Sequence, residues 1–139
     1  MKTKVIFNDT IPFQGFIAMT VWPYIFVRNS AAKRYTVIAS NHEHIHGEQQ
    51  KEMLLVGIVL AAIGFMFIGL WALLFIPVFF WLYGLEYLFR LCQYRNTGKA
   101  YRNISTEREA YAYENDLDYL RRRKHFAWLK FIFSNNIKN

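Results

Sequence analysis

An unbroken run of 33 uncharged residues, positions 53–85, limits most strongly how this chain can fold. About 18 such residues are enough for a transmembrane helix. A straight helix over the whole run would be roughly 50 Å long, whereas the hydrocarbon core of a bilayer is about 30 Å thick. The run is therefore too long for one upright span and short for two complete ones.

Gly69 near the middle of the run and Pro77 in its second half suggest a turn. Two helical legs of about 16 residues would each be near 24 Å long, which fits a hairpin that nearly spans or dips deeply into a membrane. The alternative is a buried hairpin in a soluble protein, for which few residues remain as a cover. We therefore expect an apolar helical hairpin at about 53–85 that contacts membrane lipid.

The segments around the hairpin predict a single α+β domain over residues 1–139. Residues 3–29 are rich in β-branched and aromatic side chains, with turn signals between them, and predict a small antiparallel sheet with strands at about 4–8, 15–21 and 24–28. A helix is expected from about Ser40 into the apolar run. Residues 94–98 read as a loop with a helix-ending glycine, and a last helix is expected over about 106–124.

The strongest chemical signal is the motif H-E-x-x-H, formed by His42, Glu43 and His46. Residues four apart share one face of a helix, so the two imidazoles can bind one zinc ion. Glu43, beside the first histidine, can then act as general base towards a water molecule that zinc activates. His44 points away from this face and is not expected to be a ligand.

Other interpretations of these residues remain open. Ser40 and Glu43 also fit a capping box at a helix start, and the two histidines could be interfacial polar residues at the foot of a membrane helix. Gln49 and Gln50 lie within about one turn of the histidine face. They could orient ligands, contact substrate or simply precede the membrane.

A catalytic zinc site needs a third protein ligand from elsewhere in the chain. The acidic residues cluster at positions 107–116, and Glu109 is followed by an alanine that leaves room for a partner helix. Tyr113 and Asp116 share a helical face with Glu109 and could support the site from outside. Glu107 is the other candidate, and Thr106 with Glu109 also fits a capping box.

These motifs resemble the gluzincin branch of zinc metallopeptidases, in which H-E-x-x-H is followed by a helix that carries the third ligand, a glutamate. The order of motif, apolar hairpin and glutamate helix is similar to membrane metallopeptidases of the heat-shock and CAAX-processing types. The strings NHEHIHGEQQ and YRNISTEREAY resemble, more closely, a family of short, uncharacterised bacterial proteins with the same metallopeptidase motifs.

The resemblance implies His42, His46 and Glu109 as zinc ligands and Glu43 as base. The protease families usually show E-x-x-A-D, and here Tyr111 stands where the aspartate would be. The chain is also much shorter than those proteases, which leaves less material for a substrate cleft.

Charge supports a hairpin whose two ends lie on one side of a membrane. Residues 1–52 carry six Lys or Arg and four Asp or Glu, and residues 90–139 carry eleven and five. Because basic flanks stay on the cytoplasmic side, both ends are expected in the cytoplasm, at a bacterial inner membrane. Contact with anionic lipid also explains the net charge of +7 more simply than binding of nucleic acid does. The residues expected at the membrane interface are Trp71, Arg121, Arg122, Arg123 and Trp128.

The sequence thus predicts a membrane-associated zinc metallopeptidase with an unknown peptide or protein substrate. The alternative is a non-catalytic membrane anchor or interaction protein whose two motifs are only helix caps. The enzyme interpretation requires the chain to turn back within the apolar run, because a single crossing would place His46 and Glu109 on opposite sides of the membrane.

Overall fold

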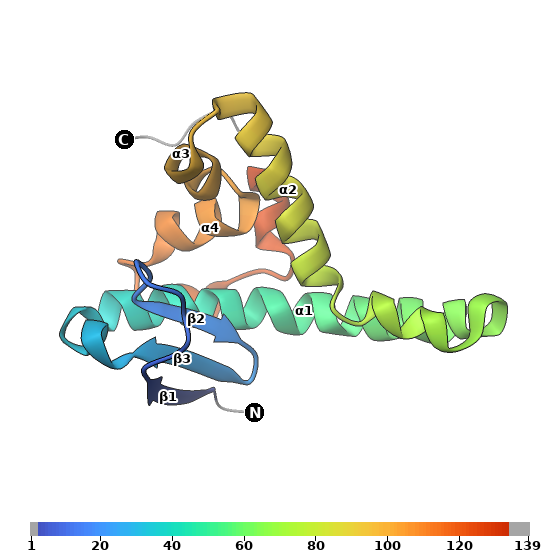
Figure 1. Ribbon diagram of the computed structural model, residues 1–139, viewed down its shortest axis with the longest axis horizontal. Coiled ribbons are helices and arrows are strands. Elements are labelled where there is room, and N and C mark those ends of the chain that lie inside the picture. Colours follow the sequence, from blue (N-terminus) through green and yellow to red (C-terminus); the bar gives the residue numbers. More distant parts are fainter. Residues whose placement is uncertain (1–2, 134–139) are drawn as a thin grey trace.

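The computed structural model describes residues 3–133, and its α+β architecture confirms the expected fold class. A three-stranded sheet comes first, followed by one very long helix and several shorter ones (Figure 1). The strands and the longer helices are β1 (Lys4–Asn8), β2 (Ala18–Val21), β3 (Tyr24–Arg28), α1 (Val37–Ile68), α2 (Val78–Tyr94) and α4 (Ser105–Tyr113). The shorter helical segments are η1 (Asn29–Arg34), η2 (Gly69–Phe75), α3 (Thr97–Arg102), α5 (Tyr119–Arg122) and η3 (Ala127–Phe131).

The sheet has the strand order β1-β3-β2 and lies against the first half of α1. Strands β2 and β3 form the expected antiparallel hairpin, whereas β1 pairs with β3 in parallel. The sheet is therefore mixed rather than purely antiparallel. The connection over residues 9–17 is long enough to carry the chain past the central position, which β3 then fills.

Helix α1 begins earlier than expected, at Val37, and the hydroxyl of Thr36 accepts a hydrogen bond from the backbone N–H of Ala39 (3.3 Å). Ser40 and Glu43 thus lie inside the helix and do not form its capping box. The first half of α1 buries polar residues against the sheet and α4, whereas most of the second half exposes apolar side chains.

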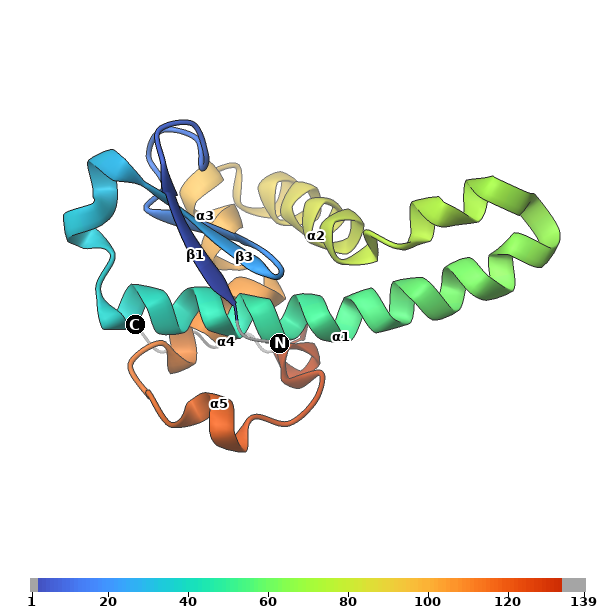
Figure 2. The same ribbon diagram turned by 90° about the horizontal axis from the view of Figure 1, so that it is seen from below.

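The apolar run turns back at Gly69, as the hairpin interpretation requires (Figure 2). Gly69 has φ +57°, in the left-handed region that favours glycine, and η2 then returns along α1. The two legs touch at Gly57, where a Cβ atom would lie 2.5 Å from the carbonyl oxygen of Ile76. By length and composition alone, the helical stretch Val37–Phe75 could cross a membrane.

Helix α2 begins after Pro77 and leaves the hairpin at a steep angle to α1 (Figure 1). It ends at Tyr94, where Arg95 adopts the left-handed conformation, while Gly98 lies inside α3 rather than in the expected loop. The predicted last helix is also divided, because the chain leaves helical geometry between α4 and α5. These changes of direction return α4 to the first half of α1.

Candidate metal centre

The first half of α1 brings His42 and His46 together. One helical turn separates them, so both imidazoles point to the same side, and their Nε2 atoms lie 3.1 Å apart. Both side chains are about 90% buried. His44, on another face, contacts the backbone carbonyl of Ser40 through Nδ1 (2.7 Å), as expected for a residue outside the site.

Helix α4 adds one carboxylate to the pair, and it belongs to Glu107. Its two oxygens lie 3.4 Å from Nε2 of His42 and 3.3 Å from Nε2 of His46. Candidate ligand atoms of the three residues fall within 4.8 Å of one another. Ligands at zinc bond lengths of about 2.0–2.2 Å in a tetrahedron are roughly 3.3 Å apart, so the separations match a shared ion.

The outer nitrogens of both imidazoles already face acceptors. Nδ1 of His42 lies 2.9 Å from a carboxylate oxygen of Glu114, and Nδ1 of His46 lies 2.9 Å from Oε1 of Gln49. The orientation of Gln49 is fixed because its amide nitrogen donates to the carbonyl of Thr106 and to Glu109. These contacts occupy both Nδ1 atoms and leave the two Nε2 atoms facing each other and Glu107.

The three side chains could hold a cation between their ligand atoms. Oε2 of Glu107 accepts no hydrogen bond from the described residues, although the atom is buried. Burial alone would raise the pKa of this carboxyl, but contacts with His46 and His42 hold it below its ordinary value. Burial likewise opposes the charged form of His46, yet mainly Glu107 raises its pKa to about 9. The donor set of two imidazoles and one carboxylate fits zinc.

Glu43 lies beside this centre, at the wall of a cavity of about 570 Å³. Its carboxylate accepts a hydrogen bond from the hydroxyl of Thr20 on β2 (2.7 Å). Glu43, His46 and Glu107 are the charged or titratable residues other than tyrosine among those that line the cavity. The other walls are mainly apolar and come from β2, the loop before it, α2 and α3, namely Pro12, Phe13, Phe16, Ala18, Met19, Phe79, Phe80, Tyr83, Tyr87 and Tyr101.

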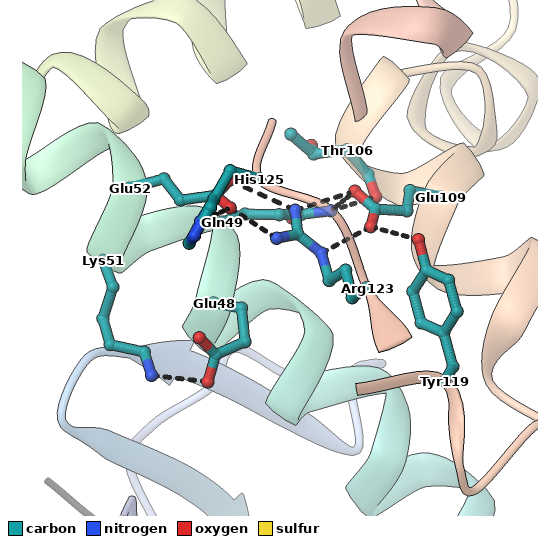
Figure 3. Close-up of polar contacts among 9 residues, drawn as sticks. All are labelled: Glu48, Gln49, Lys51, Glu52, Thr106, Glu109, Tyr119, Arg123 and His125. Carbon is teal, nitrogen blue, oxygen red and sulfur yellow. Dashed lines mark hydrogen bonds and ion pairs between the residues drawn. The ribbon is translucent and has the colours of Figure 1, made fainter. Parts of the chain in front are cut away.

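Glu109 does not take the place that the sequence predicts for it, and the third candidate ligand is corrected to Glu107. Residues two apart on a helix point about 200° from one another, so both glutamates cannot face the histidines. Glu109 instead accepts hydrogen bonds from Tyr119 (2.7 Å), Arg123 (2.6 Å) and Gln49 (3.0 Å), as Figure 3 shows. The cap interpretation also fails, because Ile104 precedes α4 without a side-chain cap.

The expected supporting residues divide into two groups. Gln49 contacts His46 directly, and Gln50 links α1 to the sheet by accepting from the N–H of Trp22 and donating to the carbonyl of Thr20. Tyr113 instead stacks on Tyr119 at 3.9 Å, and the Asp116 carboxylate pairs with Arg122. Tyr113 and Asp116 therefore do not support the metal centre through their side chains.

The expected interface residues also divide. Trp71 is 74% exposed at the hairpin end, and the side chains of Arg121 and Arg122 are exposed. Arg123 is buried between Glu52 and Glu109 (Figure 3), and Trp128 packs with Met53 and Phe79. Arg123 and Trp128 thus face the protein, which corrects their assignment to the membrane interface.

Three residues that were not among the expected site residues complete the site. Glu114 holds His42, Tyr83 donates its hydroxyl to Glu107 (2.8 Å), and the amide of Asn41 donates to the carbonyls of Glu114 (2.9 Å) and Asp116 (3.1 Å) at the end of α4. A signal for Glu107 was present, because the pattern E-x-x-A begins at Glu107 when its alanine is Ala110. For Glu114, Tyr83 and Asn41, no local pattern in the sequence indicates these contacts.

Comparisons of the chain with protein-family models, curated proteins and solved structures found no match. The metallopeptidase interpretation therefore depends on the residues of the site itself.

Proposed function

We propose that the protein is a membrane-associated zinc metallopeptidase. The observation that carries the proposal is the convergence of two Nε2 atoms and the Glu107 carboxylate, while both Nδ1 atoms are held by other acceptors. Buried charges are otherwise paired, so a buried carboxylate with an unpartnered oxygen beside two imidazole Nε2 atoms supports a metal ion there.

In this proposal His42, His46 and Glu107 would hold the ion, and three is the number of protein ligands typical of catalytic zinc sites. Zinc would supply Lewis-acid chemistry, which polarises a carbonyl and activates water at neutral pH. Glu43 takes a proton from the attacking water and passes it to the leaving amine. The hydroxyl of Thr20 orients the Glu43 carboxylate, and the cavity beside it would receive the substrate.

The apolar hairpin supports a position at a bacterial inner membrane. Its exposed side chains are almost entirely apolar, and the basic segments on both sides favour the cytoplasmic face. His46 precedes the apolar run by only seven residues, so the metal centre would lie close to the membrane surface.

A non-catalytic membrane anchor is the competing function. The main argument for the anchor is that both motifs could be capping boxes at helix starts. Neither Ser40–Glu43 nor Thr106–Glu109 caps a helix, which removes this argument. The anchor would still share the hairpin, so metal content and hydrolysis must separate the two functions.

The first test is metal content by mass spectrometry on protein purified without chelators. We expect about one zinc per chain, lost in His46→Ala and Glu107→Gln but retained in His44→Ala, which alters a neighbouring imidazole. Stoichiometric zinc in His46→Ala would refute the site.

The second test separates catalysis from metal binding. Glu43→Gln should retain zinc and abolish hydrolysis of a peptide library by the detergent-solubilised protein, because the amide cannot accept the proton. Glu48→Gln, a change at an exposed carboxylate on the same helix, should keep both properties. Equal hydrolysis in Glu43→Gln and the unaltered protein would favour the anchor.

A further inference from the structure

The hairpin has a part that lies free of the rest of the protein, and its length is fixed by two contacts. Met53 is buried with Phe79 and Trp128, and the legs cross where Gly57 meets the carbonyl of Ile76. Beyond that crossing, α1 continues from Gly57 to Ile68. These 12 residues rise about 18 Å, well short of a hydrocarbon core of about 30 Å.

The free part is apolar on every side. Between Gly57 and Ile76 the sequence has no charged, amide or hydroxyl side chain. The residues at its end are among the most exposed of those described, with Met66 at 84%, Phe67 at 80% and Leu70 at 74%. A second protein copy would cover one side of such a projection and leave the others in water. Lipid acyl chains surround it completely, so lipid is the occupant that fits.

Helix α2 sets the depth to which the hairpin can enter. It carries an exposed apolar stripe of Trp81, Leu85, Leu88 and Phe89, spaced as on one helical face. Figure 1 shows α2 rising steeply from α1, and in Figure 2 it is seen nearly along its axis. Because α2 diverges from the hairpin, it cannot follow the hairpin inwards, and its stripe fits the membrane surface beside the hairpin base.

We propose that the hairpin ends inside the hydrocarbon core and that the protein is monotopic, contacting water on one side of the membrane only. The inference rests on the membrane association proposed above and adds the mode of insertion. It is also consistent with the end of the hairpin, because a turn in water would expose Met66, Phe67 and Leu70. Trp71 then lies among the acyl chains and not at the far interface.

Cysteine accessibility tests this arrangement in liposomes of phosphatidylethanolamine and phosphatidylglycerol (3:1), to which the protein is added from outside. Cys92, the single native cysteine, is first replaced by serine. Leu70→Cys then places a thiol at the hairpin end, and Lys99→Cys is the matched control on exposed α3. A membrane-impermeant maleimide is supplied outside the vesicles or trapped within them.

We expect the thiol at position 99 to react with external reagent, and the thiol at position 70 to react with neither pool until detergent dissolves the vesicles. Reaction at position 70 with trapped reagent would show that the hairpin crosses, which overturns the monotopic mode while leaving membrane association intact. Reaction with external reagent would show that the hairpin does not insert, so the membrane part of the proposed function would fail.

A charge at the hairpin end provides a second readout that does not depend on labelling. Leu70→Arg should reduce flotation of the protein with these vesicles at least about tenfold, because the charge would be held in hydrocarbon. If the hairpin crossed, the arginine would reach water on the far side and flotation would be unchanged. Zinc content, measured on the same preparations, reports separately whether the metal centre has formed.

Discussion

His46 is oriented by a chain of polar contacts that continues well beyond the metal centre. Its Nδ1 faces Gln49, the amide of Gln49 donates to Glu109, and Glu109 is held by Arg123 and Tyr119. Each hydrogen bond fixes the orientation of the side chain that it joins, and that orientation in turn fixes the next one. Glu109 therefore serves the site indirectly, through the amide that fixes the imidazole of His46.

Replacing Gln49 tests this chain. Gln49→Leu should lower zinc affinity about 10- to 100-fold, because His46 loses the acceptor that sets its tautomer and ring orientation. Competition with a chromophoric chelator measures the change. The neighbouring Gln50→Leu is the control, since the described hydrogen bonds of the Gln50 side chain go to the backbone of Thr20 and Trp22 and its loss should affect thermal stability rather than zinc affinity. Similar zinc affinities for both variants would contradict the role of Gln49.

Which site residues the sequence could predict follows from how local each contact is. His42 and His46 were predictable because a four-residue spacing places them together on any helix. The choice between Glu107 and Glu109 depends on the rotation of α4, which Glu86 of α2 helps to fix by accepting hydrogen bonds from the backbone and hydroxyl of Ser105. Arg123 looked like part of an exposed basic run, and only the tertiary fold shows that it is buried.

At the level of elements, α1 combines two helices of different character. Its first half is a buried polar helix that carries the candidate metal ligands, and its second half is an apolar helix that packs against η2 and exposes most of its side chains. The turn at Gly69 was predictable because one straight helix over the apolar run 53–85 would be longer than the hydrocarbon core of a bilayer is thick. The parallel pairing of β1 was not, because strand patterns do not encode which neighbour a strand selects.

The close approach of the two hairpin legs depends on Gly57. Gly57→Ala should destabilise the protein by about 1–3 kcal/mol in detergent, because the added methyl group overlaps backbone carbonyls that cannot move as a side chain would. Thermal unfolding followed by circular dichroism measures the loss. Gly84→Ala, at a helical glycine with open space around it, should be neutral or slightly stabilising. Equal effects of the two changes would show that the legs do not pack as described.

For the whole molecule, Arg123 joins three parts of the chain that are distant in sequence. Its guanidinium bonds to Glu52 on α1 (2.6 Å) and Glu109 on α4, while the residue itself follows α5. Burial lowers the pKa of a guanidinium, but the bonds to both carboxylates outweigh this effect and raise the pKa of Arg123. Its charge therefore stays in place between the two helices that carry the candidate metal ligands.

Removing this charge should have a large effect on stability. Arg123→Met leaves two buried carboxylates without their cation and should cost about 3–5 kcal/mol in the free energy of unfolding. Arg121→Met, at an exposed ion pair with Asp118, should cost less than about 1 kcal/mol. Urea titration in a fixed detergent compares the two variants. A small loss for Arg123→Met would mean that the three parts are held together by other contacts.

In the proposed metallopeptidase, the continuity of α1 has a consequence for substrate choice. The helix runs without interruption from His46 to the hairpin crossing at Gly57, a rise of about 16 Å. If the hairpin is anchored in lipid, this rigid segment fixes the distance of Glu43, His42 and His46 from the bilayer. A bond would then be selected by its distance from the membrane as well as by its chemistry, and adding or removing one turn of α1 would move the position of cleavage.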